Sequence, residues 1–383
     1  MQNSNLPAQH DLIPFENPLP SWGASQKATG KKLMITKEAD SDLRRLNTYE
    51  KTLAYNAACT LVSEGGYGLG SAGFFKSPMF MRFKKFKGGV GLRYSSNPEM
   101  LIVNQVELKR ELTDLDTPNN KQQMGLFEIK RESGMRWHET SSHEDVQELQ
   151  KAWSRPVRVH RIGTEHVAIN GMLNNLDKAR WLMGVHMDTA YWEDYAKAYT
   201  LIHNPTRGWL PDFFECLQDK LGTSKLAQFV AVMLLESQQK GEKRKWTAHS
   251  QGGIILTRAV ELVNQRGVRL EGQRVSIHAG GNDKERAESA FKQAGMTIDN
   301  ITRDHPFDPV PNLAGGNNVS RSSIGHGLGN LGLVAGSSSP VETSPHTLPF
   351  LSAECSIRHL QMNGYHKKAE KLALQVMKDM DLV

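Results

Sequence analysis

The sequence is poor in cysteine and has no long apolar run. Its three cysteines, Cys59, Cys216 and Cys355, lie far apart in 383 residues, so they offer neither a disulfide framework nor a CxxC metal site. No stretch approaches the roughly 20 consecutive apolar residues of a transmembrane helix. The first residues, MQNSNLPAQHDLIPFENPLP, lack the basic region and apolar block of a Sec-type signal peptide. We therefore expect cytoplasmic synthesis and no transmembrane span.

Motifs that bind metals or nucleotides are also missing. The sequence contains no HExxH, EF-hand or zinc-ligand spacing, and its 14 histidines are scattered singly. The Gly-rich segments 312–316 and 334–340 lack the lysine of the GxxxxGK[ST] phosphate loop. We expect neither a metal nor an organic cofactor.

The positive charge of the chain is concentrated in one segment. The 47 Lys and Arg residues exceed the 41 Asp and Glu residues, which gives a net charge of +6. Residues 65–97 contain six basic residues and no acidic residue, so their charge equals that of the whole chain. A generally basic nucleic-acid binder would carry its positive charge over more of the sequence. We therefore expect no specific nucleic-acid partner.

The patterning divides the chain into three regions. Residues 1–45 show no sustained periodicity and predict an extended arm, and residues 46–150 form an N-terminal region with a helix over 46–64. From residue 151 to 383, strand and helix signals alternate, which is typical of a mostly parallel α/β sheet with helices on both faces. The predicted strands in this region are 157–162, 166–169, 199–203, 244–248, 274–278 and 297–302, and the predicted helices include 175–185, 252–265, 284–294 and 367–380.

The segment KWTAHSQGGI places Ser250 between a predicted strand and a predicted helix. A nucleophile elbow holds its serine in a strained backbone conformation, so the positions two before and two after must be nearly free of side chain. Ala248 and Gly252 meet this need, with one methyl more than the usual glycine at the first position. The turn exposes the serine hydroxyl in front of a helix N-terminus, which favours negative charge. This arrangement suits attack on a carbonyl.

The run Ala248-His249-Ser250-Gln251-Gly252 resembles the elbow of α/β-hydrolase lipases and esterases, including short bacterial lipases with alanine at the first position. The resemblance spans roughly residues 157–350 and implies an α/β-hydrolase-like fold and a Ser-His-Asp triad. Asn170-Gly171-Met172 and the run 203–208 also resemble a poorly characterised chlamydial group of hydrolase-like proteins, a likeness that implies no activity.

The acid of the triad should follow the serine, because α/β-hydrolases order their triad as Ser, acid, His. Asp308 lies in HPFDPVPNL, whose Asp-x-Val-Pro pattern is similar to the loop that carries the catalytic aspartate of fungal-type lipases. Prolines 309 and 311 would stiffen this loop. Asp283 and Asp304 are the alternatives, and an ordinary turn aspartate is the simpler explanation of Asp308.

The base should follow the acid. His346 in ETSPHTLPF precedes an apolar segment and the final helix, which is where the lipase-like pattern places the base. His326, His359 and His366 are the other choices, and His249 is more typical of packing or orientation. We interpret residues 317–341 around His326 as a mobile loop over the site, with a plain surface loop as the alternative.

The oxyanion hole requires two backbone N–H groups. The resemblance assigns one to Gln251, directly after the serine, and the other to Gly171 or Met172 in the loop after an earlier strand. A simple strand-to-helix turn explains Gly171 and Met172 equally well.

The segment 65–97 interleaves rings and cations. Such a pattern suits an anionic membrane surface, single-stranded nucleic acid, or a β-hairpin with its rings on the core face. Membrane contact agrees best with a lipase-like catalytic half. The candidate surface residues are Phe75, Lys76, Phe80, Arg82, Phe83, Lys84, Lys85, Phe86 and Lys87.

Taken together, these patterns predict a serine hydrolase of lipase, phospholipase or esterase type that acts on a lipid or ester substrate. Thioesterase and acyltransferase are alternatives within the enzyme class. A further hypothesis is an effector that a specialised system secretes to degrade membrane lipids, with a delivery or inhibitor protein as partner. The rival class is a catalytically inactive hydrolase-like scaffold, such as a virion, secretion-apparatus or interaction protein.

Overall fold

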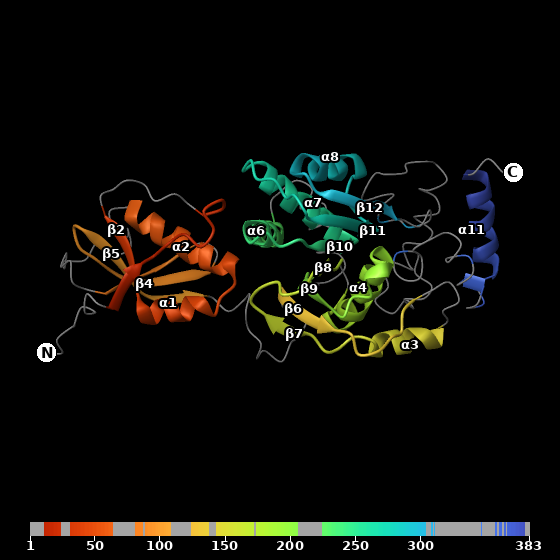
Figure 1. Cartoon of the computed structure of the whole chain (residues 1–383), viewed down its shortest axis with the longest axis horizontal. Coiled ribbons are helices and arrows are strands. Elements are labelled where there is room, and N and C mark those ends of the chain that lie inside the picture. Colours follow the sequence, from red (N-terminus) through yellow and green to blue (C-terminus); the bar gives the residue numbers. More distant parts are fainter. Residues whose placement is uncertain are drawn as a thin grey trace. The chain divides into compact units, whose positions relative to one another are not determined.

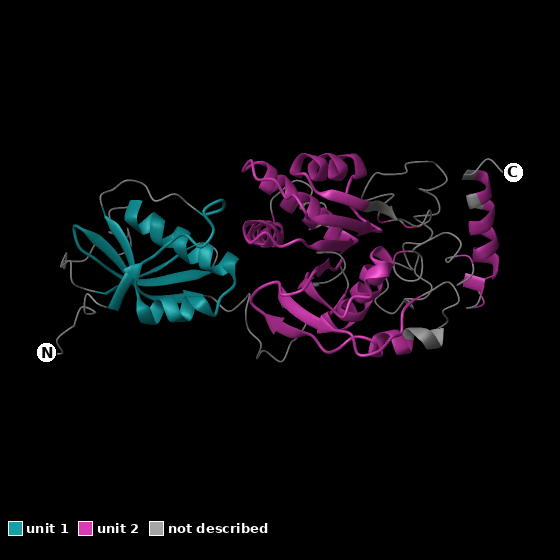
Figure 2. Cartoon of the chain, viewed as in Figure 1, with its two compact units in different colours: residues 1–114 teal, residues 115–383 magenta. Residues whose placement is uncertain are grey.

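The chain forms two compact units in a computed structural model, residues 1–114 and 115–383 (Figure 2). We predicted boundaries after residues 45 and 150 instead. The structure describes residues 11–23, 31–63, 81–86, 89–108, 124–137, 143–171, 174–205, 224–303, 308, 310, 346, 357, 360, 361, 364 and 366–379. The predicted mobile loop 317–341 lies outside these residues.

The smaller unit contains a five-stranded sheet in the order β1-β2-β5-β4-β3. β2 and β5 pair in parallel, and the other neighbours are antiparallel. Two helices contribute to one core with the sheet, and the second confirms the helix predicted over 46–64. The elements are β1 (Leu12–Pro14), β2 (Lys32–Thr36), α1 (Lys37–Arg44), α2 (Thr48–Ser63), β3 (Arg82–Lys85), β4 (Val90–Ser96) and β5 (Met100–Leu108).

The prediction of an extended arm over residues 1–45 is wrong for its described part. Leu33 and Ile35 on β2 are buried in the core of the smaller unit. Thr36 then caps α1, because its side chain accepts a hydrogen bond from the Ala39 N–H at 3.2 Å. A strand of five residues is too short to show clear periodicity, and its stability comes from pairing with β5, far along the chain.

The larger unit is built on a seven-stranded sheet in the order β12-β11-β10-β8-β9-β6-β7. The neighbouring strands from β12 to β9 pair in parallel. At the other edge, β6 pairs antiparallel with β9, and β7 pairs antiparallel with β6. The predicted α/β class with a mostly parallel sheet is confirmed. Because β6 pairs with β9 along its whole length, this unit begins well before residue 151. The strands are β6 (Gly125–Lys130), β7 (Val157–Val159), β8 (His166–Ile169), β9 (Ala198–His203), β10 (Lys245–His249), β11 (Arg274–His278) and β12 (Thr297–Arg303).

Helices cover both faces of this sheet (Figure 1). The crossover from β8 to β9 runs one way along the sheet, and the crossovers from β9 to β10, β11 and β12 run the other way. Since such crossovers are right-handed, α4 lies on one face and α6, α7 and α8 lie on the other. The helices are α3 (His143–Lys151), α4 (Leu176–Ala190), α6 (Lys225–Gln239), α7 (Gln251–Asn264), α8 (Lys284–Ala294) and α11 (His366–Asp379).

The adjacent strands β8 and β10 form a topological switch point. The chain leaves β8 toward α4 on one face and leaves β10 toward α7 on the opposite face. In open α/β sheets, ligands bind in the crevice beyond the carboxyl ends of two such strands. We therefore expect a ligand site near residues 170–171 and 250–251, which follow these two strands.

Capping explains where several helices begin. The side chains of Ser224 and Asp283 accept hydrogen bonds from the N–H groups of Ala227 and Arg286, which begins α6 and α8. Gly295 ends α8 with a φ of 76°, which a residue without Cβ adopts at little cost. Among the described residues, no helix combines the length and apolarity needed to cross a membrane.

Asp188 on α4 forms a buried ion pair with Arg131, and Arg136 lies on its other side, 3.7 Å away. The three side chains are at most 9% exposed. Burial raises the pKa of the Asp188 carboxyl, and the charge of Arg131 offsets this effect only in part. The guanidinium of Arg131 also lies over the ring of Trp153, 4.2 Å from its centre. This cluster joins α4 to the segment that follows β6.

The variant Asp188→Asn should lower the free energy of unfolding by about 3–5 kcal/mol, because it leaves buried cations without a counter-charge. Urea denaturation followed by tryptophan fluorescence measures this, since six of the seven tryptophans lie in residues 115–383. Glu288→Gln is the control, because Glu288 pairs with Lys292 at the exposed surface. Its effect should be below about 1 kcal/mol. Equal shifts in both variants would contradict the prediction.

Candidate active site

Ser250 lies in a strained turn between β10 and α7. Its φ of 58° and ψ of −127° are unusual for a residue with a side chain. Three backbone hydrogen bonds hold it: its N–H donates to the His278 carbonyl at 3.2 Å, and its carbonyl accepts from Gly253 at 3.0 Å and Gly281 at 3.1 Å. This is the geometry that the sequence predicts for a nucleophile elbow.

The elbow packs tightly against the residues at the end of β8. Neither Gly252 of the elbow nor Gly171 after β8 has room for a Cβ atom. A Cβ on Gly252 would lie 2.4 Å from the Ile169 carbonyl oxygen. A Cβ on Gly171 would lie 2.3 Å from the Ser250 Cβ and 2.9 Å from its Oγ. Gly171 is thus placed directly against the serine side chain.

Asp308 and His346, the acid and the base that the sequence predicts, lie within hydrogen-bonding distance of each other. The Nδ1 of His346 lies 2.7 Å from Oδ2 of Asp308, and the other carboxylate oxygen accepts the Val310 N–H at 2.9 Å. Asp308 is fully buried and His346 is 8% exposed. The imidazole is therefore oriented with Nδ1 toward the acid, which reserves Nε2 for a second partner.

His346 is bound to the residue that precedes Ser250. The Nε2 of His249 lies 2.7 Å from the His346 carbonyl oxygen. The two rings are tilted, with their centres 4.7 Å apart. The structure thus brings Asp308 and His346 together and binds His346 to the residue before Ser250.

Burial raises the pKa of the Asp308 carboxyl well above its ordinary value, and the hydrogen bond from Val310 opposes this shift. A buried carboxylate is stabilised most when a positive charge forms beside it. The imidazolium of His346 would be that charge. The pair is therefore suited to a reaction in which His346 gains a proton.

The alternatives from the sequence lie elsewhere or outside the described residues. Asp283 caps α8, and His366 is exposed at the first position of α11. Met172 and three further candidates belong to the part of the chain that the structure does not describe, namely Asp304, His326 and His359.

The amide of Gln251 is the first of α7, and the first four amides of a helix have no acceptor within that helix.

A network of side-chain hydrogen bonds that we did not predict holds the loops next to Ser250. The Asn170 side chain donates to the Asn204 carbonyl at 3.0 Å and accepts the Asn204 N–H at 2.8 Å. The Asn204 side chain donates to Oε1 of Gln251 at 2.8 Å. This network ties together the ends of β8, β9 and β10, where the oxyanion donors are expected.

Four histidines form a buried column beside Ser250. The His186 ring stacks on that of His249, with centres 4.3 Å apart. The Nδ1 atoms of His186 and His278 lie 3.1 Å apart, and the contact of His249 with His346 completes the column. We did not predict His186 or His278, because a lone histidine in a helix or a strand carries no local signal.

One group among the described residues has the spacing of a metal site. The ligand atoms of Glu165, His166 and Asp194 lie within 4.8 Å of one another. However, Nζ of Lys245 lies 2.8 Å from Glu165 and 2.5 Å from Asp194. The ammonium group already supplies the positive charge that a cation would bring, so we assign no metal here.

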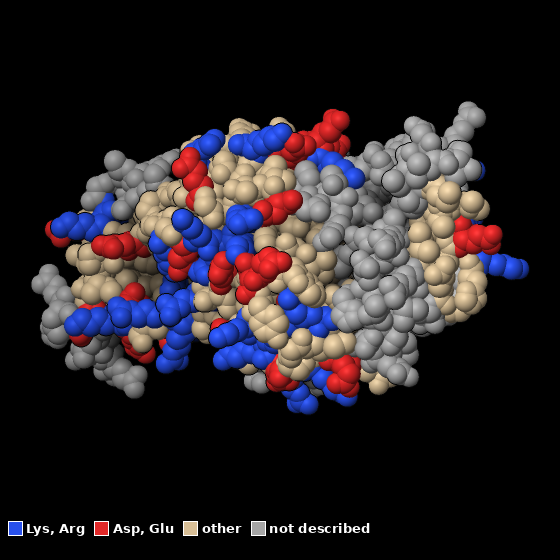
Figure 3. Space-filling model, turned by 45° about the vertical axis from the view of Figure 1, so that its right-hand side comes forward, with Lys and Arg blue, Asp and Glu red and all other residues tan. Residues whose placement is uncertain are grey.

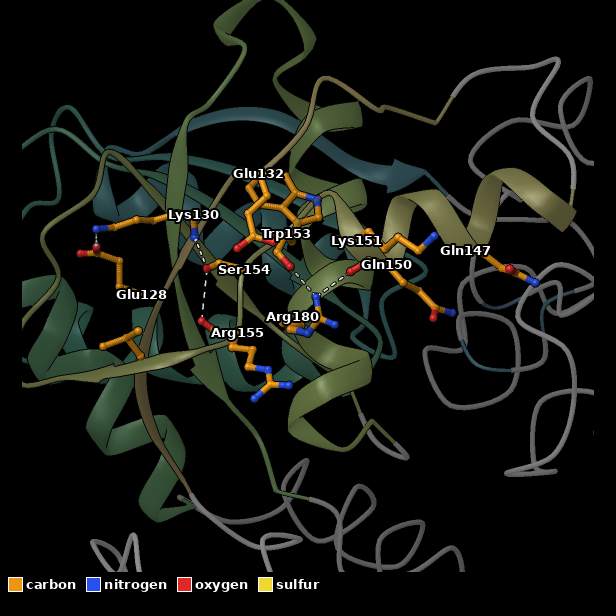
Figure 4. A pocket seen from close by; sticks show the side chains of 11 residues that line it. Glu128, Lys130, Glu132, Gln147, Gln150, Lys151, Trp153, Ser154, Arg155 and Arg180 are labelled. Atoms are coloured by element: carbon orange, nitrogen blue, oxygen red, sulfur yellow. Dashed lines mark hydrogen bonds and ion pairs between the residues drawn. The ribbon is translucent and has the colours of Figure 1, made fainter.

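A pocket of about 1010 Å³ lies at the β6–β7 edge of the sheet, and its lining includes none of Ser250, Asp308 and His346 (Figure 4). Its lining carries both charge signs. Arg180 donates to the carbonyls of Gln150 and Trp153 at 2.7 and 2.5 Å, which fastens α4 to the end of α3 and to the chain that follows it. We assign this pocket no ligand.

The basic aromatic segment is described only from Met81 to Phe86 and from Gly89 onward, so Phe75, Lys76, Phe80 and Lys87 lie outside the described residues. The hairpin alternative is confirmed for β3 and β4, which pair antiparallel.

The two described phenylalanine rings of this hairpin differ in their surroundings. Phe86 packs against the core of the smaller unit. Phe83 is 44% exposed, and the cationic groups of Arg93 and Lys85 lie 5.6 and 5.7 Å from its ring centre. The expectation that the rings face the core is thus wrong for Phe83. Contact with an anionic surface stays a prediction.

If Ser250 is the nucleophile that the sequence predicts, the variant Gly171→Ala should lower kcat for ester hydrolysis about 10²-fold, because its methyl group would displace the Ser250 side chain and misplacement by about 1 Å costs this much. Ester hydrolysis by purified protein measures the loss. Gly163→Ala is the control, since its Cβ would make only an ordinary contact, 3.8 Å from Glu128. Equal activity of the two variants would contradict the assigned geometry.

The arrangement can activate a hydroxyl group and stabilise a charge that develops beside it. Ser250 offers a hydroxyl group, His346 offers an imidazole whose Nδ1 is held by Asp308, and the N-terminus of α7 favours negative charge. Comparisons with family models, with curated proteins and with solved structures gave no match to this chain.

Proposed function

We propose that this protein is a serine hydrolase of lipase, phospholipase or esterase type. The observation that carries the proposal is the Asp308–His346 pair, which is bound through His249 to the strained turn that holds Ser250. An ordinary turn aspartate would not be fully buried with its carboxylate 2.7 Å from an imidazole. A buried carboxylate that costs stability is better explained by a role in catalysis.

In the proposed reaction, Oγ of Ser250 attacks the ester carbonyl while Nε2 of His346 takes the hydroxyl proton. The carbonyl π electrons move to oxygen, and the Gln251 amide with that of Gly171 or Met172 stabilises the oxyanion. The intermediate collapses, the C–O bond to the alcohol breaks, and His346 returns the proton to the leaving alkoxide. Water then attacks the acyl-enzyme by the same route and releases the carboxylic acid.

The topology supports this proposal. In α/β-hydrolases the second oxyanion donor comes from the loop after the third strand, and β8, the third strand of the larger unit, ends at Ile169, two residues before Gly171. Asp308 carries the negative charge that stabilises the imidazolium of His346 during the reaction. On the face drawn in Figure 3, the described Lys and Arg side chains are interspersed with those of Asp and Glu.

A fluorophosphonate probe tests the proposal. The probe should label the wild-type protein at Ser250, as mass spectrometry of the labelled peptide would show, and should not label Ser250→Ala. A folded wild-type protein that stays unlabelled would favour the inactive scaffold.

A substrate panel then separates the chemical classes. Chromogenic esters of increasing chain length, phospholipid vesicles, thioesters and ester–alcohol mixtures report on esterase, phospholipase, thioesterase and acyltransferase activity. We expect carboxylic ester hydrolysis to exceed the other reactions. Faster thioester cleavage or acyl transfer would assign the protein to a thioesterase or an acyltransferase class, and the proposed roles of Ser250, Asp308 and His346 would be unchanged.

A further inference from the structure

We propose that His249 is a positioning residue for the catalytic base, which it holds in place through the main chain of His346. This inference rests on the proposed hydrolase function and adds a residue to its machinery. His249 is the last residue of β10 and directly precedes Ser250, so a bond from its ring to His346 links the nucleophile and the base through rigid backbone.

The hydrogen bond fixes the protonation of the His249 ring. A carbonyl oxygen only accepts, so Nε2 of His249 must carry the proton that it donates to His346 at 2.7 Å. Burial, and to a smaller extent the neighbouring His346, lower the pKa of His249 well below its ordinary value. His249 therefore stays neutral, and with Nε2 engaged as a donor it does not compete with His346 for the serine proton.

The other ring nitrogen of His249 shows that placing a histidine here lowers the stability of the fold. Nδ1 of His249 is buried and has no hydrogen-bond partner among the described residues. A buried acceptor without a partner destabilises a fold, so an apolar ring would be the better choice for packing alone. What a histidine provides here, and an apolar residue does not, is the N–H group that reaches the His346 carbonyl.

The His186 ring restricts the orientation of His249. The two rings stack at an interplanar angle of 22°, with centres 4.3 Å apart, and His186 is itself held at Nδ1 by His278 on β11. Rotation of the His249 ring away from His346 would break this stack. The column thus fixes His249, and His249 fixes the segment that presents His346 to Asp308.

A pair of isosteric variants tests the proposal. Glutamine can place an N–H donor near the position of Nε2, and methionine has a similar length without a donor. We expect His249→Met to lower kcat about 10²-fold with little change in KM, since a misplacement of about 1 Å costs this much. His249→Gln should keep kcat within about tenfold of the wild-type value.

The pH profile of kcat/KM distinguishes positioning from packing. Loss of alignment with Asp308 removes the carboxylate that favours the imidazolium, so the apparent pKa of the base should fall in His249→Met and recover in His249→Gln. Equal losses in the two variants, or an unchanged profile in His249→Met, would overturn the proposal. His186→Leu is a second variant in case His249→Met does not fold, and a smaller shift of the same sign is expected.

Proton NMR of the resting protein separates this proposal from the proposed function. The Nδ1–H of His346 that is hydrogen-bonded to Asp308 should give a strongly deshielded resonance in the wild-type protein and in His249→Gln. It should be lost or broadened in His249→Met. Because this readout needs no turnover, a protein that shows these spectra and hydrolyses nothing would support positioning and contradict the hydrolase. Persistence of the resonance in His249→Met would overturn positioning.

Discussion

Replacement of Ser250 by alanine is expected to lower kcat for ester hydrolysis about 10⁶-fold, and His346→Gln should lower it by a similar factor. The double variant should lose no more than either single variant, because a nucleophile and its base act as one unit. The residual rate would come from the oxyanion amides and from substrate binding. Initial rates with a chromogenic ester, normalised to folded protein, measure all three variants.

Two histidine variants serve as controls for this first prediction. His366→Gln changes an exposed histidine at the start of α11 and should leave kcat unchanged. His326→Gln changes the alternative base that the sequence offers. Activity that survives in His346→Gln and disappears in His326→Gln would overturn the assignment of the base.

The variant Asp308→Asn should lower kcat about 10⁴-fold, because an asparagine amide favours the wrong tautomer of His346 and does not stabilise the imidazolium. The fold should survive this change. The pKa of Asp308 is raised in the folded state, so the carboxylate lowers stability as the pH rises from its unfolded value through the folded one. At neutral pH we therefore expect a Tm equal to or above that of the wild-type protein.

Asp283→Asn is the matched control for Asp308→Asn. Asp283 caps α8 with its side chain, and asparagine caps a helix about as well. We expect an unchanged kcat and an unchanged Tm for this variant. A large loss of activity in Asp283→Asn, with little loss in Asp308→Asn, would show that the acid has been misassigned.

Strong local patterns explain what was predictable from the sequence. The strand over 274–278 and the helix over 284–294 match the structure at both ends, because Asp283 caps the helix and Gly295 terminates it. The elbow was predictable for a similar reason, since its small residues are local and their spacing is set by the turn at Ser250. Asp308 and His346 were predicted from chain order and from the likeness of their loops to those of lipases, and neither loop alone shows that the two side chains meet.

Features that rely on distant partners were not predictable. The strand Lys32–Thr36 is stabilised by pairing with β5, and its five residues alone give no period. Asn170 and Asn204 look like ordinary loop residues until β8 and β9 lie side by side. His186 acquires its place in the column only when α4 packs on the sheet beside β10.

The order of the three triad segments along the chain has a consequence for the timing of activity during synthesis. Ser250 is made first, then Asp308, and His346 last. A ribosome adds about 5–20 residues per second, so about 5–20 s pass between the nucleophile and the base. On the proposed assignment, β10, α7 and the elbow can form while the chain still lacks its base. A nascent chain would therefore be inert as a hydrolase until His346 has left the ribosome and been anchored by His249.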